Sequence, residues 1–412
     1  MLMTWHTSFR RGRKGWQAAV AWECRSCWVH HLLANASDRG RVRHHAVNKR
    51  YRPTVLVGYL LNFNSTGKTT VIQSLAFVKQ SLQKKELSFN DYLLRLGDYR
   101  EVVSRHDTDL PIRISVTLDG DAEELQYSLE ASMGGVVESF AVDGEEGWKW
   151  DSRTDGAVEA SGRLFFPIAA GGYGGGVFTS PDPEKTMQEQ KRTMGWFENM
   201  LYLSSNRGFT KYNYPLLAGK PTVEDISNRT GDSSALEEWL SNLIIYRINE
   251  AKRYPAMEAQ LDRMTDRLSS LGVEISPYVM SGPSVVIDLA ESGMWVSAVN
   301  SGYGVNQSVA SIVLGSLSEP GSLVMIEEPE THLHPRFQRT MAQILADFTK
   351  EGKQVLITSH SDHVLQELRK LVLAGTVPEE DVKVYHFAKE DRITRASEID
   401  VTDEAALREL FS

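Results

Sequence analysis

The chain has 412 residues, of which 41% are hydrophobic and 24% charged, with 45 basic and 54 acidic side chains and two cysteines. These values are typical of a folded protein with a core large enough for two or three lobes, and no stretch approaches the roughly 20 apolar residues that cross a membrane. A membrane-spanning protein is therefore excluded, the few cysteines favour the reducing cytoplasm, and the net charge of −9 argues against a protein wrapped wholly around nucleic acid.

Residues 1–52 differ in composition from the rest of the chain. They carry 11 basic and 2 acidic side chains, a net charge of +9, so the other 360 residues carry −18. Neither a strand period nor a helix period persists there, and we expect a basic N-terminal segment that is disordered or not native to the folded body. A basic arm that binds nucleic acid is the alternative. Cys24 and Cys27 make only half of a structural zinc site, because no second pair exists.

Regular structure is predicted from Pro53 onward. Residues 54–61 form a β-branched and aliphatic run that is typical of a buried parallel strand. After a short turn, apolar residues recur at helical spacing between Ile72 and Leu82. Residues 53–110 are therefore predicted to form the first α/β lobe.

Residues 111–233 have the pattern of antiparallel strands and loops. Apolar and polar side chains alternate over residues 112–118 and again over residues 125–131, with Asp119-Gly120 between them. This is the pattern of a β-hairpin with a tight turn. Residues 171–185 are rich in glycine and proline and are predicted to form a loop or linker.

The second half of the chain begins with a predicted helical insertion at residues 234–280. An apolar stripe runs through residues 234–271 and is interrupted near Pro255. Residues 281–412 then form the second lobe. Strands are predicted there at residues 285–290, 294–299, 323–326, 354–358 and 382–387, and helices from Asn306 and at residues 335–348. This alternation of strand and helix indicates an α/β sheet.

The turn after the first strand has the features of a phosphate-binding P-loop, in which backbone N–H groups and a helix N-terminus face the anion. The predicted loop comprises Asn64, Ser65, Thr66, Gly67, Lys68, Thr69 and Thr70. We expect Lys68 to bridge the β- and γ-phosphates of ATP and Thr69 to offer its hydroxyl to Mg²⁺. The usual glycine five residues before Gly67 is replaced by Asn62, a residue that tolerates a left-handed backbone better than most.

Two carboxylates, Glu327 and Glu328, directly follow the aliphatic run at residues 323–326. Side by side at the end of a buried strand, they would repel each other unless a cation or a function holds them there. We expect Glu327 to lie near Mg²⁺ and Glu328 to polarise the attacking water. The alternative is a pair of acidic residues that only caps the next helix.

Two further motifs have weaker individual signals. His360 follows the strand at residues 354–358, where an imidazole could bond the γ-phosphate, although a histidine satisfied at a strand end is the alternative. Ser301, Gly302 and Gly304 precede a helical pattern, and small residues let backbone amides approach an anion. The alternative for this second motif is a glycine-rich turn.

The order of these motifs resembles that of ABC-type ATPase heads. In detail the chain resembles prokaryotic AAA-family ATPases related to the OLD (overcoming lysogenization defect) and RecF/SMC proteins. The string EEPETHLHPRFQ carries most of the resemblance, and VLITSHSDHVL, LGDYREVV and VKVYHF support it. The similarity spans about residues 53–400, and residues 1–52 have no counterpart.

The resemblance implies an α/β fold: a P-loop NTPase of the ABC-ATPase-head type, with an antiparallel β subdomain and a helical insertion. It implies that two copies enclose ATP, which Lys68 and Thr69 of one copy bind with Mg²⁺. The other copy would contribute Ser301, Gly302 and Gly304, with Asn306 and the nucleotide-binding Gln307 at the start of the signature helix. By the same resemblance, Glu328 would be the catalytic base, Glu327 the acidic residue near Mg²⁺, and His360 the switch histidine. His332 and His334 would lie along the dimer interface, and Arg207 matches an arginine that recurs in the family.

We therefore expect an ATP-binding and ATP-hydrolysing switch, a homodimer or higher oligomer, that controls a separate effector protein or acts on DNA, as in phage defence. OLD nucleases continue into a metal-binding Toprim domain, for which this sequence has no counterpart.

Two alternatives stay open. One is a non-catalytic nucleotide-binding scaffold with a degenerate P-loop. The other is a nuclease using Asp107, Asp109, Asp119 and Asp121, which have the character of loop and turn residues.

Overall fold

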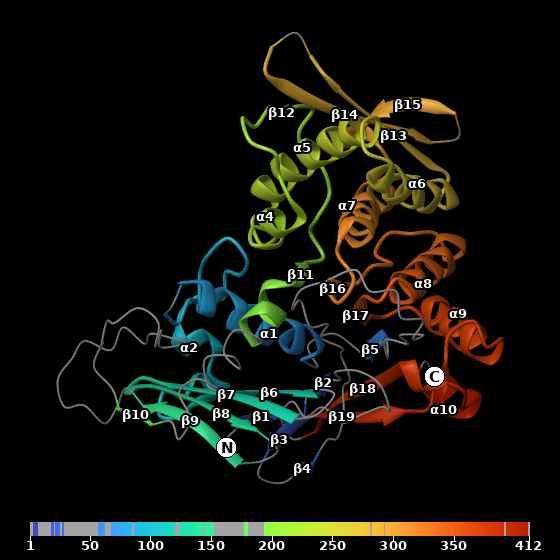
Figure 1. Cartoon of the computed structure of the whole chain (residues 1–412). Coiled ribbons are helices and arrows are strands. Elements are labelled where there is room, and N and C mark those ends of the chain that lie inside the picture. The colour runs from blue at the N-terminus through green and yellow to red at the C-terminus, as the bar shows by residue number, and fades with distance from the viewer. Residues whose placement is uncertain are drawn as a thin grey trace, which may run out of the picture.

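The computed structural model describes residues 67–84, 86–119, 124–142, 145–151, 193–280, 282–291, 293–390 and 393–410, and short strands at residues 3–6, 18–19, 21–24, 27–28, 57–61 and 177–179. These residues form three β-sheets with helices packed against them (Figure 1). None of the described helices is both long enough and apolar enough to span a membrane.

A six-stranded sheet carries the predicted motifs. Its strands lie in the order β11 (Met200–Leu203), β16 (Leu323–Glu327), β17 (Gln354–Ser359), β5 (Val57–Leu61), β18 (Val382–Glu390) and β19 (Ile393–Ile399). Neighbouring strands are parallel except for β18 and β19. β16 and β17 are buried along their whole length, which explains their unbroken aliphatic sequences. The strands predicted at residues 323–326, 354–358 and 382–387 are confirmed.

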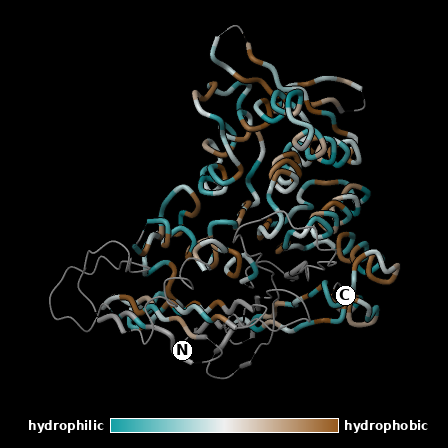
Figure 2. Tube along the Cα trace, in the orientation of Figure 1, coloured by the Kyte–Doolittle hydropathy of each residue, from teal (hydrophilic) through white to brown (hydrophobic). Residues whose placement is uncertain are grey.

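Helices cover both faces of this sheet. α7 (Tyr303–Leu317), α8 (Pro335–Lys350) and α9 (Asp362–Leu373) share a hydrophobic core with Val324 and Ile326 of β16. α1 (Lys68–Lys84) shares a second core with Leu323 and Met325 of the same strand. Alternate side chains of one strand therefore enter two separate cores. α7 is among the hydrophobic segments in Figure 2, and its residues 306–317 are all buried.

A second sheet lies on the other side of α1 (Figure 1). Its antiparallel part consists of β6 (Ile112–Asp119), β7 (Glu124–Ser132), β8 (Gly135–Val142), β9 (Glu145–Asp151) and β10 (Val177–Thr179). The predicted hairpin over residues 112–131 is confirmed. The loop predicted at residues 171–185 is wrong at β10, because this segment pairs with the open edge of β9.

Four short strands of the N-terminal segment extend the second sheet. They are β1 (Met3–His6), β2 (Ala18–Ala19), β3 (Ala21–Cys24) and β4 (Cys27–Trp28). β1 pairs in parallel with β6, and β2 pairs antiparallel with it. At these strands the structure differs from the expectation that residues 1–52 stand apart from the folded body, because the edge of β6 offers backbone partners that composition does not reveal. The rest of the segment lies outside the described residues.

An arm, made of residues 204–297, extends from this core and is coloured green to orange at the top of Figure 1. It contains α4 (Val223–Ser227), α5 (Ser233–Ala251), α6 (Pro255–Ser270), β12 (Tyr214–Pro215), β13 (Val273–Val279), β14 (Ser284–Glu291) and β15 (Met294–Ser297). The predicted break near Pro255 is confirmed, since α6 starts with this proline, where its missing N–H costs no helical hydrogen bond. Two shorter helices lie elsewhere, α2 (Tyr99–Val102) and α10 (Glu404–Glu409).

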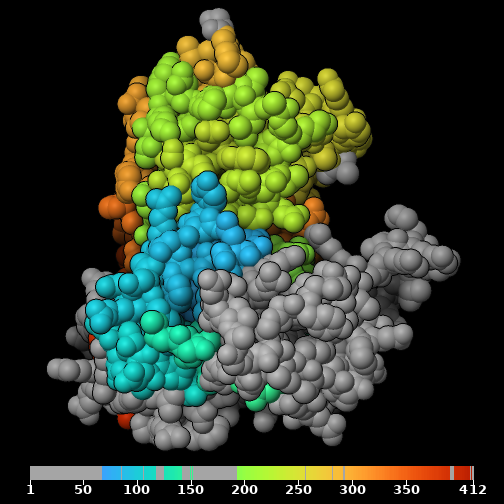
Figure 3. All heavy atoms as spheres, turned by 90° about the vertical axis from the view of Figure 1, so that its left-hand side faces the viewer, coloured from blue at the N-terminus to red at the C-terminus, as the bar shows by residue number. Residues whose placement is uncertain are grey.

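The segment after α1 lies between the arm and the second sheet, as the blue spheres in Figure 3 show. Gly231, just before α5, makes the close contact on the arm side. Its main-chain N donates to the oxygen of Tyr92 at 2.8 Å. A Cβ at Gly231 would lie 1.9 Å from the oxygen of Leu93, so only glycine fits at this crossing.

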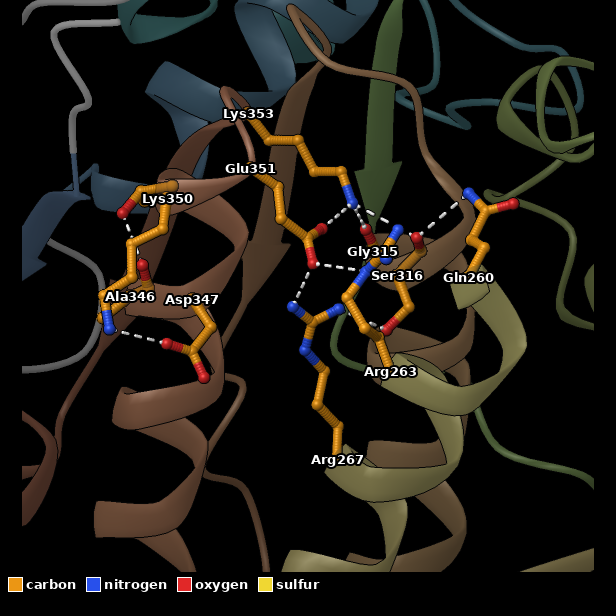
Figure 4. A network of polar contacts seen from close by, with 11 residues as sticks. Gln260, Arg263, Arg267, Gly315, Ser316, Ala346, Asp347, Lys350, Glu351 and Lys353 are labelled. Atoms are coloured by element: carbon orange, nitrogen blue, oxygen red, sulfur yellow. Dashed lines mark hydrogen bonds and ion pairs between the residues drawn. The ribbon is translucent and has the colours of Figure 1, made fainter. Parts of the chain in front are cut away.

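A buried polar cluster, which we call the joint, fastens the arm to the core (Figure 4). The joint consists of Arg267 on α6 and of Glu351 and Lys353 between α8 and β17. Lys353 Nζ donates to the main-chain oxygens of Gly315 at 2.7 Å and Ser316 at 3.2 Å, and it lies 2.6 Å from Glu351. Arg267 pairs with the other Glu351 oxygen and donates to Ser316 Oγ at 3.0 Å. The joint thus connects α6, the end of α7 and the start of β17.

Candidate active site

Three of the predicted residues meet at the carboxyl edge of the six-stranded sheet. Lys68 opens α1, Glu328 follows β16, and His360 follows β17. Lys68 is only 5% exposed, and burial lowers its pKa against the opposing effect of the Glu328 and Glu330 charges. The two carboxylates therefore lie within electrostatic range of the Lys68 amine. The structure brings the lysine and the glutamates of two distant motifs into one site.

Glu328 and His360 form the open part of this site. Their Oε1 and Nε2 atoms are 3.6 Å apart, and the side chains are 38% and 35% exposed, which leaves both accessible to a ligand. Burial lowers the pKa of His360, and the Lys68 charge lowers it further, whereas Glu328 raises it. The ordinary histidine pKa is 6.5, so the imidazole is neutral at pH 7 and has one donor and one acceptor nitrogen.

The main chain of Glu328 is in the left-handed region, with φ of 44°. For a residue with a Cβ this conformation costs about 1–3 kcal/mol and persists only when its surroundings enforce it. Glu328 N donates to the oxygen of Thr358 at 2.9 Å, and Thr331 Oγ1 donates to the oxygen of Glu328 at 2.9 Å. These bonds fix the direction in which the Glu328 carboxylate leaves the main chain.

Arg207 supports both glutamates from within the protein. Its guanidinium donates to the main-chain oxygens of Glu327 at 2.6 Å and Glu328 at 3.0 Å. Burial lowers the pKa of Arg207 to about 10, against the opposing charges of Glu330, Glu327 and Glu328, so the side chain stays protonated at pH 7. The sequence identifies Arg207 only as a recurrent arginine, and the structure gives it this supporting contact.

Glu327, the predicted Mg²⁺-side acid, is almost wholly buried, and its Oε1 accepts from the Tyr202 hydroxyl at 2.7 Å. Burial raises the pKa of Glu327, and the hydrogen bond from Tyr202 opposes this rise. In the part of the chain that the structure describes, no group of three or more His, Cys, Asp or Glu could hold a metal alone. Mg²⁺ prefers one or two carboxylates together with hydroxyl, water and phosphate oxygens. Glu327 and Thr69 offer a carboxylate and a hydroxyl, the oxygen types that Mg²⁺ brought in with ATP would need.

The P-loop is described only in part. Gly67, Lys68, Thr69 and Thr70 are among the described residues, whereas Asn62, Asn64, Ser65 and Thr66 lie outside them. Gly67 has φ of 93°, a conformation that favours glycine. Lys68 and Thr69 form the first turn of α1, as phosphate binding at a helix N-terminus requires.

The predicted signature has an outer and an inner part. Ser301 and Gly302 precede α7, and Gly302 is exposed. Gly304 is buried, and a Cβ there would lie 2.4 Å from the oxygen of His332. Gln307 is buried too, and its Oε1 accepts from the main-chain N of Arg207 at 2.8 Å. Gly304 and Gln307 thus make contacts within their own chain, because this side of α7 packs against the protein, and their contacts with nucleotide stay a prediction.

The two histidines predicted for a dimer seam have different surroundings. The His332 ring lies 4.7 Å from the Tyr303 ring in an edge-to-face arrangement, and both residues are exposed. His334 Nδ1 accepts from Arg336 N at 3.3 Å and caps α8. Tyr303 and His332 therefore extend the exposed surface that begins at Gly302.

The acidic residues considered for a nuclease do not form a site among the described residues. Asp107 accepts from Asp109 N at 3.1 Å, which is a contact within a turn. Asp119 ends β6, and Asp121 lies outside the described residues. A nuclease centre at these positions has no support in the structure.

Sequence reasoning missed the residues that hold the paired glutamates. Tyr202 lies on β11, which is far from β16 in the sequence but pairs with it in the sheet. No local sequence pattern could therefore reveal the hydrogen bond from Tyr202 to Glu327. Thr358, the next-to-last residue of β17, accepts from Glu328 N through its main-chain oxygen at 2.9 Å and its Oγ1 at 3.3 Å. Its polar hydroxyl in an aliphatic strand was the signal that could have identified it.

Comparisons with known proteins agree with an ATPase. Residues 183–365 match the family model of the AAA ATPase domain, and this segment includes Arg207, Glu328 and His360. The match supports an AAA or ABC-type ATPase and a nucleotide-binding function. The α/β fold of the ABC-ATPase-head type expected from the sequence is confirmed. No curated protein sequence matches the chain.

Solved structures similar to this chain include heads of SMC proteins. The SMC head bound to the C-terminal winged-helix domain of ScpA is 12% identical, with a TM-score of 0.43, and the alignment covers 86% of this chain and 92% of that one. A Pyrococcus furiosus SMC head with an extended coiled coil, bound to the C-terminal domain of ScpA, is 10% identical, with a TM-score of 0.46 and coverage of 86% and 93%. The SMC head of Thermotoga maritima is 10% identical, with a TM-score of 0.38 and coverage of 97% and 99%.

Proposed function

We propose that this protein is an ATP-hydrolysing switch of the ABC type that closes into a dimer around ATP. The observation that carries the proposal is the meeting of Lys68, Glu328 and His360 at one sheet edge. A buried lysine, an accessible carboxylate and a neutral imidazole are the groups that bind a triphosphate and activate water beside it.

In this mechanism Lys68 binds the β- and γ-phosphates, and Glu328 accepts a proton from the attacking water. The water oxygen bonds to the γ-phosphorus while the bond from phosphorus to the β–γ bridging oxygen breaks, giving ADP and phosphate. His360, 3.6 Å from Glu328, donates a hydrogen bond to a γ-phosphate oxygen. Thr69 and Glu327 would hold Mg²⁺, which would neutralise charge on the phosphate oxygens.

The proposed dimer uses the exposed surface at the start of α7. Ser301 and Gly302 of one copy would face the γ-phosphate held by the other, with Tyr303 and His332 beside them. A helix N-terminus stabilises an anion. The sequence motifs alone support two further proposals. The first is a closer relationship to the OLD group within this class. The second is a role in controlling an effector protein or acting on DNA, as in phage defence.

Two variants test the proposal. Lys68→Ala should lose ATP binding in a titration with labelled ATP, whereas Glu328→Gln should keep it and reduce phosphate release by about 10²–10⁴-fold, as expected when a general base is lost. Glu328→Gln should also shift to the dimer mass in light scattering when ATP and Mg²⁺ are present. Lys252→Ala and Glu319→Gln change exposed residues away from the site and serve as matched controls.

Each contrary outcome has a distinct meaning. Wild-type hydrolysis retained in either variant would exclude the proposed mechanism. Tight ATP binding without phosphate release by the wild-type protein would instead support the non-catalytic scaffold. A monomer of Glu328→Gln at saturating ATP would refute the dimer and leave the catalytic assignment standing.

A further inference from the structure

Glu330 is a buried carboxylate that the mechanism above does not use. It lies two residues after Glu328, with a relative exposure of 6%. Its Oε1 accepts two hydrogen bonds, from Ser359 Oγ at 2.5 Å and from His360 N at 2.8 Å. Its Oε2 is buried and has no hydrogen-bond partner among the described residues. One oxygen atom therefore binds two successive residues of the turn that carries His360.

The same turn is tied to α9 through Ser359 and Ser361. Ser361 N donates to Ser359 Oγ at 3.0 Å, so the Ser359 hydroxyl both donates to Glu330 and accepts from the turn. Ser361 Oγ accepts from Val364 N at 3.1 Å and donates to Gln338 at 2.6 Å. Glu330 is thus a side-chain link between the glutamate loop and the His360 turn, in addition to the main-chain bond from Glu328 N to Thr358.

The two linked segments carry the two accessible groups of the site. Glu328 precedes Glu330 by two residues, and His360 is the residue whose main-chain N Glu330 binds. The Glu330 side chain is therefore one connection, beside the bond from Glu328 N to Thr358, between the segments that carry Glu328 and His360, whose side chains are 3.6 Å apart.

We propose that Glu330 is a positioning residue that sets His360 against Glu328 by binding the His360 turn through Oε1. This inference rests on the proposed ATPase function and assigns a role to a residue that touches no reacting atom. The proposal depends on the acceptor oxygen and not on the negative charge. A residue that keeps an oxygen at Oε1 should therefore preserve the arrangement.

Two substitutions separate the acceptor from the rest of the side chain. Glu330→Gln keeps a carbonyl oxygen that can accept both bonds, whereas Glu330→Ala removes it. We expect Glu330→Ala to lower kcat for ATP hydrolysis by at least about 10-fold with little change in KM, because a displaced catalytic group can cost up to 10²-fold. Glu330→Gln should stay within about threefold of the wild-type kcat.

A double-mutant cycle with His360→Ala tests whether the effect passes through His360. Once His360 is removed, Glu330→Ala should lower kcat by less than about twofold further, because the group that it positions is gone. Equal losses in Glu330→Ala and Glu330→Gln would overturn the proposal. So would multiplicative effects of Glu330→Ala and His360→Ala.

A readout besides activity keeps the inference separate from the proposed function. The His360 ring signal in a ¹³C-histidine NMR spectrum, identified with His360→Ala, should move in Glu330→Ala and stay in place in Glu330→Gln, with the His386 signal as an internal control. This result would hold even in a protein that does not hydrolyse ATP. An unmoved His360 signal in folded Glu330→Ala would refute the positioning role by itself. If Glu330→Ala does not fold, Ser359→Ala removes one of the two bonds and should move the signal in the same direction.

Discussion

Arg207 donates a hydrogen bond from Nη2 to the main-chain oxygen of Glu328 at 3.0 Å. Glu328 has a left-handed main chain, and Arg207 binds the same peptide region that Thr331 binds through its hydroxyl. A second guanidinium nitrogen reaches the oxygen of Glu327 at 2.6 Å. The planar guanidinium group of arginine can donate to two consecutive carbonyl groups at once, whereas the ammonium group of lysine, on a flexible side chain, does this less well.

We therefore expect Arg207→Lys to impair catalysis more than ATP binding. The lysine keeps the charge but loses the fork, so the Glu328 carboxylate should sample more than one direction. The expected result is a fall in kcat of about 10-fold or more, because small misplacements of reacting groups are costly, with ATP affinity reduced less than threefold. Arg95→Lys, at a solvent-exposed ion pair, is the matched control. An unchanged kcat in folded Arg207→Lys would show that Arg207 does not orient Glu328.

Gly304 is expected to be required for packing. A Cβ at this position would lie 2.4 Å from the oxygen of His332, so Gly304→Ala must push α7 away from the segment after β16. Overpacking of this kind typically lowers the free energy of unfolding by about 1–3 kcal/mol. Denaturant unfolding measures the loss. Gly195→Ala, where nothing lies within 4 Å of the added Cβ, should not be destabilised, and equal stability of the two variants would contradict the close contact.

Lys79 should make stability depend on pH. Its Nζ is buried and donates to the oxygen of Met200 at 2.5 Å and to Ser227 Oγ at 3.1 Å. Burial lowers the pKa of Lys79 from 10.5 to about 7, against the opposing charges of Glu224 and Glu198.

The sign of the effect follows from proton binding. Between pH 7 and 10.5 the unfolded chain holds the Lys79 proton more tightly than the folded protein, so stability rises with pH across this window, by up to about 1.4 kcal/mol per pH unit. Lys79→Met should lack this rise when unfolding is compared at pH 7 and pH 9. Lys252→Met, at an exposed lysine, should keep it. The same pH response in wild-type protein and Lys79→Met would rule out the lowered pKa.

The joint offers a comparison of two neighbouring lysines (Figure 4). Lys353 is 2% exposed and binds Glu351 and two main-chain oxygens, whereas Lys350 is 48% exposed and pairs only with Asp347 among the contacts drawn. Removing one partner of a buried pair costs about 3–5 kcal/mol, and an exposed pair contributes about 0–1 kcal/mol. Lys353→Met should therefore reduce the free energy of unfolding by several kcal/mol, and Lys350→Met by less than about 1 kcal/mol. Similar losses in both variants would show that the joint is not a buried pair.

The strands and helices of the core were predictable because their signals are local. The aliphatic runs at residues 323–326 and 354–358 are long, uninterrupted and followed by polar residues, so both the strands and their functional ends could be located. The meeting of Lys68 with Glu328 was expected from the order of motifs, and the structure brings them into one site. These features can be predicted from the sequence of each element and from the fact that parallel strands end at the same edge of a sheet.

Other features depend on which elements become neighbours, and sequence patterns do not contain that information. Gln307 lies in a motif typical of ligand binding, but the strand order places Arg207 next to it. The Gln307 amide oxygen accepts a hydrogen bond from the main-chain N of Arg207. Glu330 looks like one more acidic residue of the motif, yet it bonds a turn that lies 30 residues further along the chain. The strands β1 and β2 were missed although β1 also pairs with the nearby β3, and the partner that joins both strands to the second sheet is β6, far along the chain.

The joint has a mechanical consequence. α7 has 15 residues and is about 22 Å long, with the exposed Gly302 before one end and the carbonyl groups bound by Lys353 at the other. Glu351 ties that far end to Arg267 of α6, so the joint couples α7 to the arm. If a second copy docks at Gly302 as proposed, we expect a displacement of α7 to pass through the joint to α6 and from there to β13, which packs against α6.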